Sequence, residues 1–202
     1  MKHYRTPGPE WCRRQWVSAE ARALWAPRIQ AITADWNAVE CATVGACRQA
    51  AVLHVDPGQL AAFSAKVAER RLVLNVMAQV GAGPSYTSGT VAPDGGAFQY
   101  KVSIATSKAV SAQLASAWAD KAQATVAELL GYPQCCAEFF AATWDEAEWH
   151  DTTWPMADGH QGADPHLAVA DVNPGTNILL RWVGVRWFPH LPCSFECEHT
   201  AQ

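Results

Sequence analysis

The chain has 202 residues, of which 50% are hydrophobic and 17% are charged, a composition typical of a globular protein. Its formal net charge of −4 argues against a general nucleic-acid binder, which carries a basic surface. No apolar run approaches the ~20 residues that cross a bilayer, and no apolar core follows the charged N-terminus as it would in a signal peptide. These features predict a soluble cytoplasmic protein that does not associate with a membrane.

The N-terminal region predicts an arm followed by an interrupted helix. Residues 1–16 contain two prolines and are expected to be irregular. Ser18 is a typical helix N-cap, and the helix that it starts over residues 19–25 is expected to bend or restart at Pro27. Helical structure should then continue over residues 29–39.

The middle of the chain alternates between strand and helix patterns. Residues 50–55 form a short apolar stretch that ends at an Asp-Pro-Gly turn signal. Residues 59–70 repeat apolar side chains at helical spacing, and residues 72–80 are rich in Val and Leu, as strands are. Apolar and polar residues alternate over 98–104, which predicts a half-buried strand.

The remaining pattern predicts long helices. One is expected over residues 108–130, with Gly131 at the position that follows a helix C-terminus. Pro133 should open the next helix at its first position, and that helix should continue through residues 135–149. The elements together predict a single helix-rich α+β domain over residues 1–202, with a small, mostly antiparallel sheet.

Two segments carry cysteines in pairs. Cys135 and Cys136 follow Pro133, so both should lie in the first turn of a helix, where the helix dipole favours a thiolate. Cys193 and Cys197 are four residues apart, a spacing that places both sulfurs on one side of a helical turn. Seven cysteines in a cytoplasmic chain do not indicate a disulfide framework. We therefore expect residues 130–202 to form a metal-binding half in which the four cysteines are the ligands.

The positions of the four cysteines along the sequence do not identify the metal. Structural zinc sites usually space their cysteines two to four residues apart, and the side chains of adjacent cysteines are expected to diverge. Four thiolates match a [4Fe–4S] cluster, in which neighbouring cysteines can reach different iron atoms. The pattern favours a [4Fe–4S] cluster, with zinc as the alternative.

The two segments resemble an uncharacterised family of small archaeal and bacterial proteins. Its motifs are Gly-Tyr-Pro-x-Cys-Cys and His-x-Pro-Cys-Ser-x-x-Cys. The matching residues here are Gly131, Tyr132, Pro133, Cys135, Cys136, His190, Pro192, Cys193, Ser194 and Cys197. The resemblance covers about the last 75 residues and implies that the four cysteines belong to one site, without supplying an activity.

Other residues near these segments are candidates for substrate binding and proton transfer. Trp149 and Trp154, together with Tyr132, could stack against a planar small-molecule substrate. His150 and Asp151 lie between the two tryptophans and could exchange protons with that substrate. His190 and His199 flank the second cysteine pair and could act as proton donors or as additional ligands.

Three functions are consistent with these features. The first is an iron–sulfur enzyme of sulfur-transfer or redox chemistry. The second is a non-enzymatic module in which zinc joins the C-terminus to a helix and a Trp-rich surface binds a protein partner. The third is a metal-free thiol oxidoreductase that uses Cys135 or Cys136. Cys41 and Cys47 could form another pair, but their spacing favours packing in the interior, and Cys12 lies in the irregular arm.

Overall fold

The computed structural model of the chain describes residues 18–34, 36–81, 96, 98–146, 156, 176, 178 and 189–201. Its contacts divide the chain into two compact units, Asn37–Gln134 and a second unit of Met1–Trp36 with Cys135–Gln202. The predicted class is confirmed, because the described residues are helix-rich and contain a small antiparallel sheet. The predicted domain boundaries stay a prediction.

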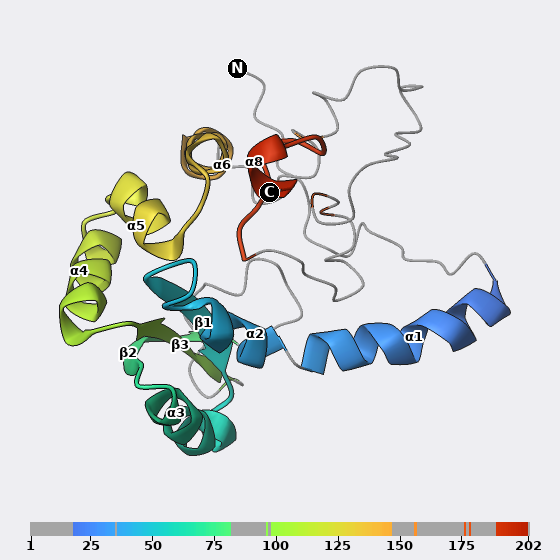
Figure 1. Cartoon of the computed structure of the whole chain (residues 1–202), viewed down its shortest axis with the longest axis horizontal. Helices are drawn as coiled ribbons and strands as arrows, with labels where there is room; N and C mark the ends of the chain where they lie inside the picture. Colours follow the sequence, from blue (N-terminus) through green and yellow to red (C-terminus); the bar gives the residue numbers. More distant parts are fainter. Residues whose placement is uncertain are drawn as a thin grey trace. The chain divides into compact units, whose positions relative to one another are not determined.

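The unit Asn37–Gln134 is built on a three-stranded sheet (Figure 1). Strand β3 (Phe98–Ala105) lies in the centre and pairs antiparallel with β1 (Ala50–Val55) on one side and β2 (Val73–Gly81) on the other. The two predicted strands are thereby confirmed, and the apolar stretch 50–55 forms an edge strand. A bulge between Val76 and Ala78 shifts the register of β2 against β3.

Helices cover both faces of this sheet because alternate strand residues contribute to two apolar clusters. The helices of this region are α2 (Trp36–Thr43), α3 (Leu60–Glu69), α4 (Lys108–Ala119) and α5 (Gln123–Leu130), and a 3-10 turn, η2 (Pro57–Gln59), precedes α3. One cluster joins α2 and α3 to the sheet and consists of Cys41, Val44, Ala51, Leu53, Val55, Phe63, Val67, Val102 and Ile104. The other joins α4 and α5 to it and consists of Ala50, Ala105, Leu114, Ala117, Val126, Leu129 and Leu130.

The predicted single helix over residues 108–130 is wrong, because the chain turns between α4 and α5. Lys121 adopts the left-handed conformation with φ of 54°. The N–H of Ala122 donates to the carbonyl of Ala117 at 2.8 Å, and the N–H of Lys121 donates to Trp118 at 3.3 Å, the bonding pattern of a Schellman motif. The turn allows α4 and α5 to pack against the same apolar cluster.

Gly131 ends α5 as predicted, with φ of 69° and ψ of 33°. Here glycine is required for two reasons. The left-handed backbone is unfavourable for other residues, and a Cβ atom would lie 2.8 Å from the Cβ of Arg48.

Replacing Gly131 with alanine is expected to lower the free energy of unfolding by roughly 1–3 kcal/mol, because it adds backbone strain and a close contact. Gly58→Ala is the matched control. A Cβ atom added at Gly58 would have no neighbouring atom within 4 Å, so this replacement should change stability by less than about 1 kcal/mol. Urea denaturation of both variants makes the comparison, and equal stabilities would contradict the proposed role of Gly131.

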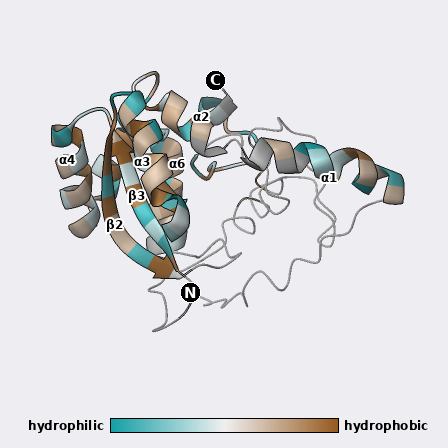
Figure 2. Cartoon of the chain, turned by 90° about the horizontal axis from the view of Figure 1, so that it is seen from below, coloured by the Kyte–Doolittle hydropathy of each residue, from teal (hydrophilic) through white to brown (hydrophobic). Residues whose placement is uncertain are grey.

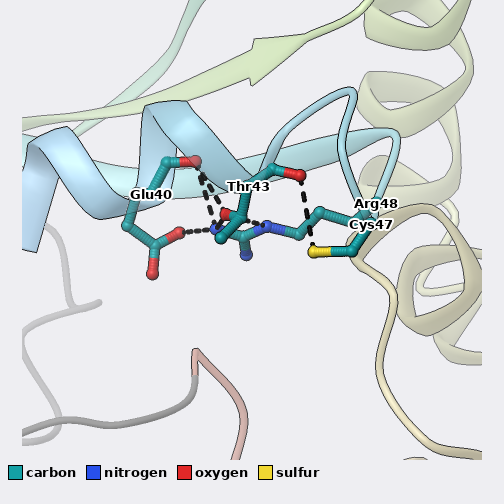
Figure 3. Close-up of polar contacts among 4 residues, drawn as sticks. All are labelled: Glu40, Thr43, Cys47 and Arg48. Carbon is teal, nitrogen blue, oxygen red and sulfur yellow. Dashed lines mark hydrogen bonds and ion pairs between the residues drawn. The ribbon is translucent and has the colours of Figure 1, made fainter.

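A buried ion pair joins α2 to the turn that follows it (Figure 3). The Arg48 guanidinium donates to the carboxylate of Glu40, and both side chains are 4% exposed. Arg48 Nε also donates to Thr43 Oγ1 at 2.9 Å, and Thr43 Oγ1 donates to the carbonyl of Glu40 at 2.9 Å. The charge of Arg48 is therefore neutralised, and its hydrogen bonds satisfy several polar groups that the fold has removed from water.

In the second unit, α1 (Ala19–Ala34) begins as predicted, because Ser18 Oγ accepts a hydrogen bond from the N–H of Ala21 at 3.1 Å. Of the bend or restart predicted at Pro27, the restart is wrong, since Pro27 lies inside one continuous helix, and the bend stays a prediction. Figure 2 shows hydrophilic and hydrophobic residues interspersed along α1. Leu24 and Trp25 are each 50% exposed.

The same unit contains α6 (Gln134–Phe140), which begins one residue later than predicted and leaves Pro133 just before the helix. A π-helical turn, η3 (Ala141–Glu146), continues it, and the rings of Phe140 and Trp144 stack at 5.2 Å across this junction. The short helix α8 (Glu198–Ala201) lies near the C-terminus.

Candidate metal centre

The two cysteine segments come from local structures that hold their side chains in place. Cys135 and Cys136 are the second and third residues of α6. Cys193 and Cys197 belong to a turn in which the N–H of Cys197 donates to the carbonyl of Ser194 at 3.4 Å. Cys197 then leads directly into α8, where the N–H of Thr200 donates to its carbonyl at 3.2 Å.

The four sulfur atoms converge. All of them lie within 4.8 Å of one another. Cys136 Sγ is 3.6 Å from Cys197 Sγ, and Cys135 Sγ is 3.8 Å from Cys197 Sγ. The predicted grouping of the two segments is confirmed as a cluster of thiols that could hold a metal ion.

One expectation about this cluster is wrong. The adjacent residues Cys135 and Cys136 do not direct their side chains apart, because their sulfurs are 3.9 Å apart. The first turn of α6 directs both side chains toward Cys197, which brings two neighbouring residues into one ligand group.

The cluster has a buried half and a partly exposed half. Cys136 is 1% exposed and Cys197 is 5% exposed, whereas Cys135 and Cys193 are partly accessible. Burial raises the pKa of the Cys136 thiol, so the predicted preference of this helix start for a thiolate is wrong at Cys136. Burial also raises the pKa of Cys193 to about 11, with a further contribution from the neighbouring sulfurs of Cys197 and Cys135.

Cys197 is the cysteine at which a thiolate is favoured. Burial opposes its charge, but hydrogen bonds from the side chain and backbone of Thr200, and from the Cys136 and Cys193 thiols, lower the pKa of Cys197 to about 6. Near neutral pH these shifts favour the thiolate at Cys197 and the protonated thiol at Cys136 and Cys193.

Thr200 is a residue of this site that the sequence pattern did not reveal. Its hydroxyl is 3.2 Å from Cys197 Sγ and 3.4 Å from Cys136 Sγ, and the side chain is 2% exposed. The one signal in the sequence is its position three residues after Cys197, since one helical turn returns the chain to the same side.

The two histidines that flank the second pair occupy different positions. His190 is buried, and its Nε2 lies 2.9 Å from Thr200 Oγ1. His199 is exposed, and its Nδ1 lies 3.7 Å from Cys135 Sγ. Their predicted roles as proton donors or extra ligands stay predictions.

The predicted substrate-binding residues are placed only in part. Trp149, His150, Asp151 and Trp154 lie outside the described residues. Tyr132 is partly buried and packs against the apolar cluster formed with α4 and α5. Its predicted contact with a substrate stays a prediction.

The other cysteines differ in environment. Cys41 is buried in the cluster between the sheet and α3, as predicted, and burial raises its pKa. The predicted burial of Cys47 is wrong, because Cys47 is exposed on a tight turn and its thiol lies 3.5 Å from the carbonyl of Thr43. Cys12 lies outside the described residues.

No protein-family model, curated protein or solved structure gives a significant match to the chain. Within the described part of the chain, no helix has the length and apolarity required to cross a membrane.

Proposed function

We propose that the chain binds one zinc ion through Cys135, Cys136, Cys193 and Cys197, and that the ion joins the start of α6 to the C-terminal segment. The observation that carries this proposal is the convergence of four sulfurs within 4.8 Å. Four thiolates at the corners of a tetrahedron are the usual ligand set of a structural zinc site.

The spacing of the sulfurs supports a single ion. Zinc–sulfur bonds of about 2.3 Å arranged tetrahedrally place the sulfurs about 3.8 Å apart. The three sulfur pairs among Cys135, Cys136 and Cys197 are 3.6, 3.8 and 3.9 Å apart. In a [4Fe–4S] cluster each thiolate binds a different corner iron of a larger core, which requires wider separation. The spacing therefore favours zinc over the cluster that the sequence pattern suggests.

The ligand count supports a structural role. Catalytic zinc sites keep one coordination position open for water or substrate, whereas four protein thiolates fill a tetrahedral ion. We propose a non-enzymatic function for the ion itself, with the fold of the C-terminal segment depending on it. A reducing compartment such as the cytoplasm would keep these thiols available for the metal.

The resemblance of these motifs to the archaeal and bacterial cysteine-motif family adds to the proposal. The motif residues Cys135, Cys136, Cys193 and Cys197 are the same four whose sulfurs converge. We propose that the shared motifs encode this metal centre.

A metal-free thiol oxidoreductase is a second candidate, favoured by one observation. Hydrogen bonds lower the pKa of Cys197 to about 6, and its sulfur is 3.6 Å from that of Cys136. Cys197 could therefore attack a substrate disulfide, and a Cys136–Cys197 disulfide would then form as the substrate leaves in its reduced dithiol form.

Metal analysis of the protein purified without chelators separates these functions. We expect a colourless protein with one equivalent of zinc per chain. Iron with acid-labile sulfide and broad visible absorption would contradict the zinc proposal in favour of the cluster. A metal-free protein that gains no zinc under reducing conditions would support the thiol oxidoreductase.

Zinc binding is expected to release protons. The raised pKa values of Cys136 and Cys193 keep both thiols protonated near neutral pH, so a zinc ion must displace at least these two protons. Apparent zinc affinity should therefore increase as the pH rises through the neutral range. Calorimetric titration in buffers of different ionisation enthalpy measures the protons released, and release of fewer than two would contradict this ligand set.

A further inference from the structure

Thr200 lies at the centre of a hydrogen-bonding arrangement on the buried side of the cysteine cluster. Its hydroxyl is within 3.4 Å of two of the four sulfurs, those of Cys136 and Cys197. On its other side it is 2.9 Å from His190 Nε2. All four of these side chains are buried.

Counting protons fixes the direction of these bonds. A hydroxyl has one proton to donate, and that proton is directed to Cys197 Sγ at 3.2 Å. His190 must then donate its Nε2 proton to the hydroxyl oxygen, because that oxygen has no second proton to offer. The Cys136 thiol can donate to the same oxygen when no metal is bound. His190 thus orients the hydroxyl toward the sulfur.

Such a donor matters most when the metal is bound. Four thiolates around a divalent ion carry a net charge of −2 in a site whose inner half is buried. Hydrogen bonds to the sulfurs spread this charge, and bonds to ionised acceptors are stronger than neutral ones. Outer groups of this kind also fix the orientation of the ligands.

On this basis, and resting on the proposed zinc site, we infer that Thr200, oriented by His190, is a positioning residue whose hydrogen bond holds the Cys197 sulfur in place as a metal ligand. The sulfur of Cys197 is the one closest to the hydroxyl and is already turned toward Cys136 and Cys135.

Cobalt(II) titration of the full chain tests this inference. Cobalt takes the place of zinc in tetrahedral thiolate sites and reports on its ligands by charge-transfer absorption. Thr200→Val keeps the shape of the side chain and removes the hydroxyl, whereas Thr200→Ser keeps the hydroxyl. We expect Thr200→Val to shift the charge-transfer band to lower energy and to weaken metal binding by about 10–100-fold, with Thr200→Ser close to the native protein.

Two results would overturn the inference. One is a native band and affinity in Thr200→Val. The other is equal impairment of Thr200→Val and Thr200→Ser, which would indicate that the residue acts only by packing.

A second pair of variants, at His190, tests the same inference if Thr200→Val does not fold. His190→Gln retains an N–H donor near the position of Nε2, and His190→Leu removes it. The inference requires a lower-energy band in His190→Leu alone, and equal bands in the two variants would refute it. A native protein that takes up no cobalt at all would instead overturn the proposed metal site, before any variant is compared.

Discussion

Replacing Cys136 with serine is expected to abolish zinc binding and to unfold the C-terminal segment. Cys136 is the most buried of the four cysteines, and its sulfur lies within 3.9 Å of two others. A serine hydroxyl is a weak ligand for zinc and would leave three thiolates in a partly buried site. Structural zinc contributes roughly 10–16 kcal/mol of apparent binding free energy in small zinc-dependent peptides, so we expect this loss to be the largest of any single substitution.

Cys47→Ser is the matched control for this prediction. Cys47 is also a free cysteine, but it is exposed and lies outside the ligand group. Metal content, measured by elemental analysis, should fall to background in Cys136→Ser and stay at one equivalent in Cys47→Ser. Limited proteolysis should cleave the C-terminal segment only in the first variant. Full zinc content in Cys136→Ser would show that the four sulfurs do not form the site.

The second large effect is expected in the other unit, at the ion pair of Glu40 and Arg48. Arg48→Met should lower the free energy of unfolding by roughly 3–5 kcal/mol, because the buried Glu40 carboxylate loses the guanidinium that compensates its charge. Thr43 also loses the hydrogen bonds that Arg48 donates to it. Chemical denaturation monitored by tryptophan fluorescence measures the change.

A double variant tests the cause of this loss. Adding Glu40→Gln to Arg48→Met removes the remaining buried charge, so it should restore part of the lost stability. If the double variant is less stable than Arg48→Met by the full effect of Glu40→Gln alone, the two residues do not interact energetically. That result would contradict the importance assigned to the ion pair.

The regular elements of the fold could be predicted where the sequence carries a local signal. The alternation of apolar and polar residues identified β3, and Ser18 and Gly131 identified one helix start and one helix end. The break between α4 and α5 carries no such signal, because the left-handed residue is Lys121 rather than glycine or asparagine. That turn is stabilised by its backbone hydrogen bonds and by the packing of α4 and α5 on one apolar cluster, which is tertiary information.

The candidate site, too, could be predicted from the sequence only in part. The residue types and spacing of the four cysteines predicted that they belong together, and their sulfurs do converge. The separations between these sulfurs could not be predicted from the positions of the cysteines in the sequence, because they depend on how α6 and the C-terminal turn meet. The proposal of a single zinc ion is based on these separations. The role of Thr200 was also hidden, because a threonine acquires this chemistry only from the sulfurs and the His190 nitrogen beside it.

X-ray absorption at the metal edge of the metal-loaded protein tests the central claim most directly. Binding of one ion by Cys135, Cys136, Cys193 and Cys197 predicts about four sulfur neighbours at about 2.3 Å and no metal–metal scattering. A metal–metal shell beside the sulfur shell would indicate a cluster and contradict the single-ion site. A first shell of nitrogen or oxygen in place of sulfur would contradict the four-cysteine ligand set.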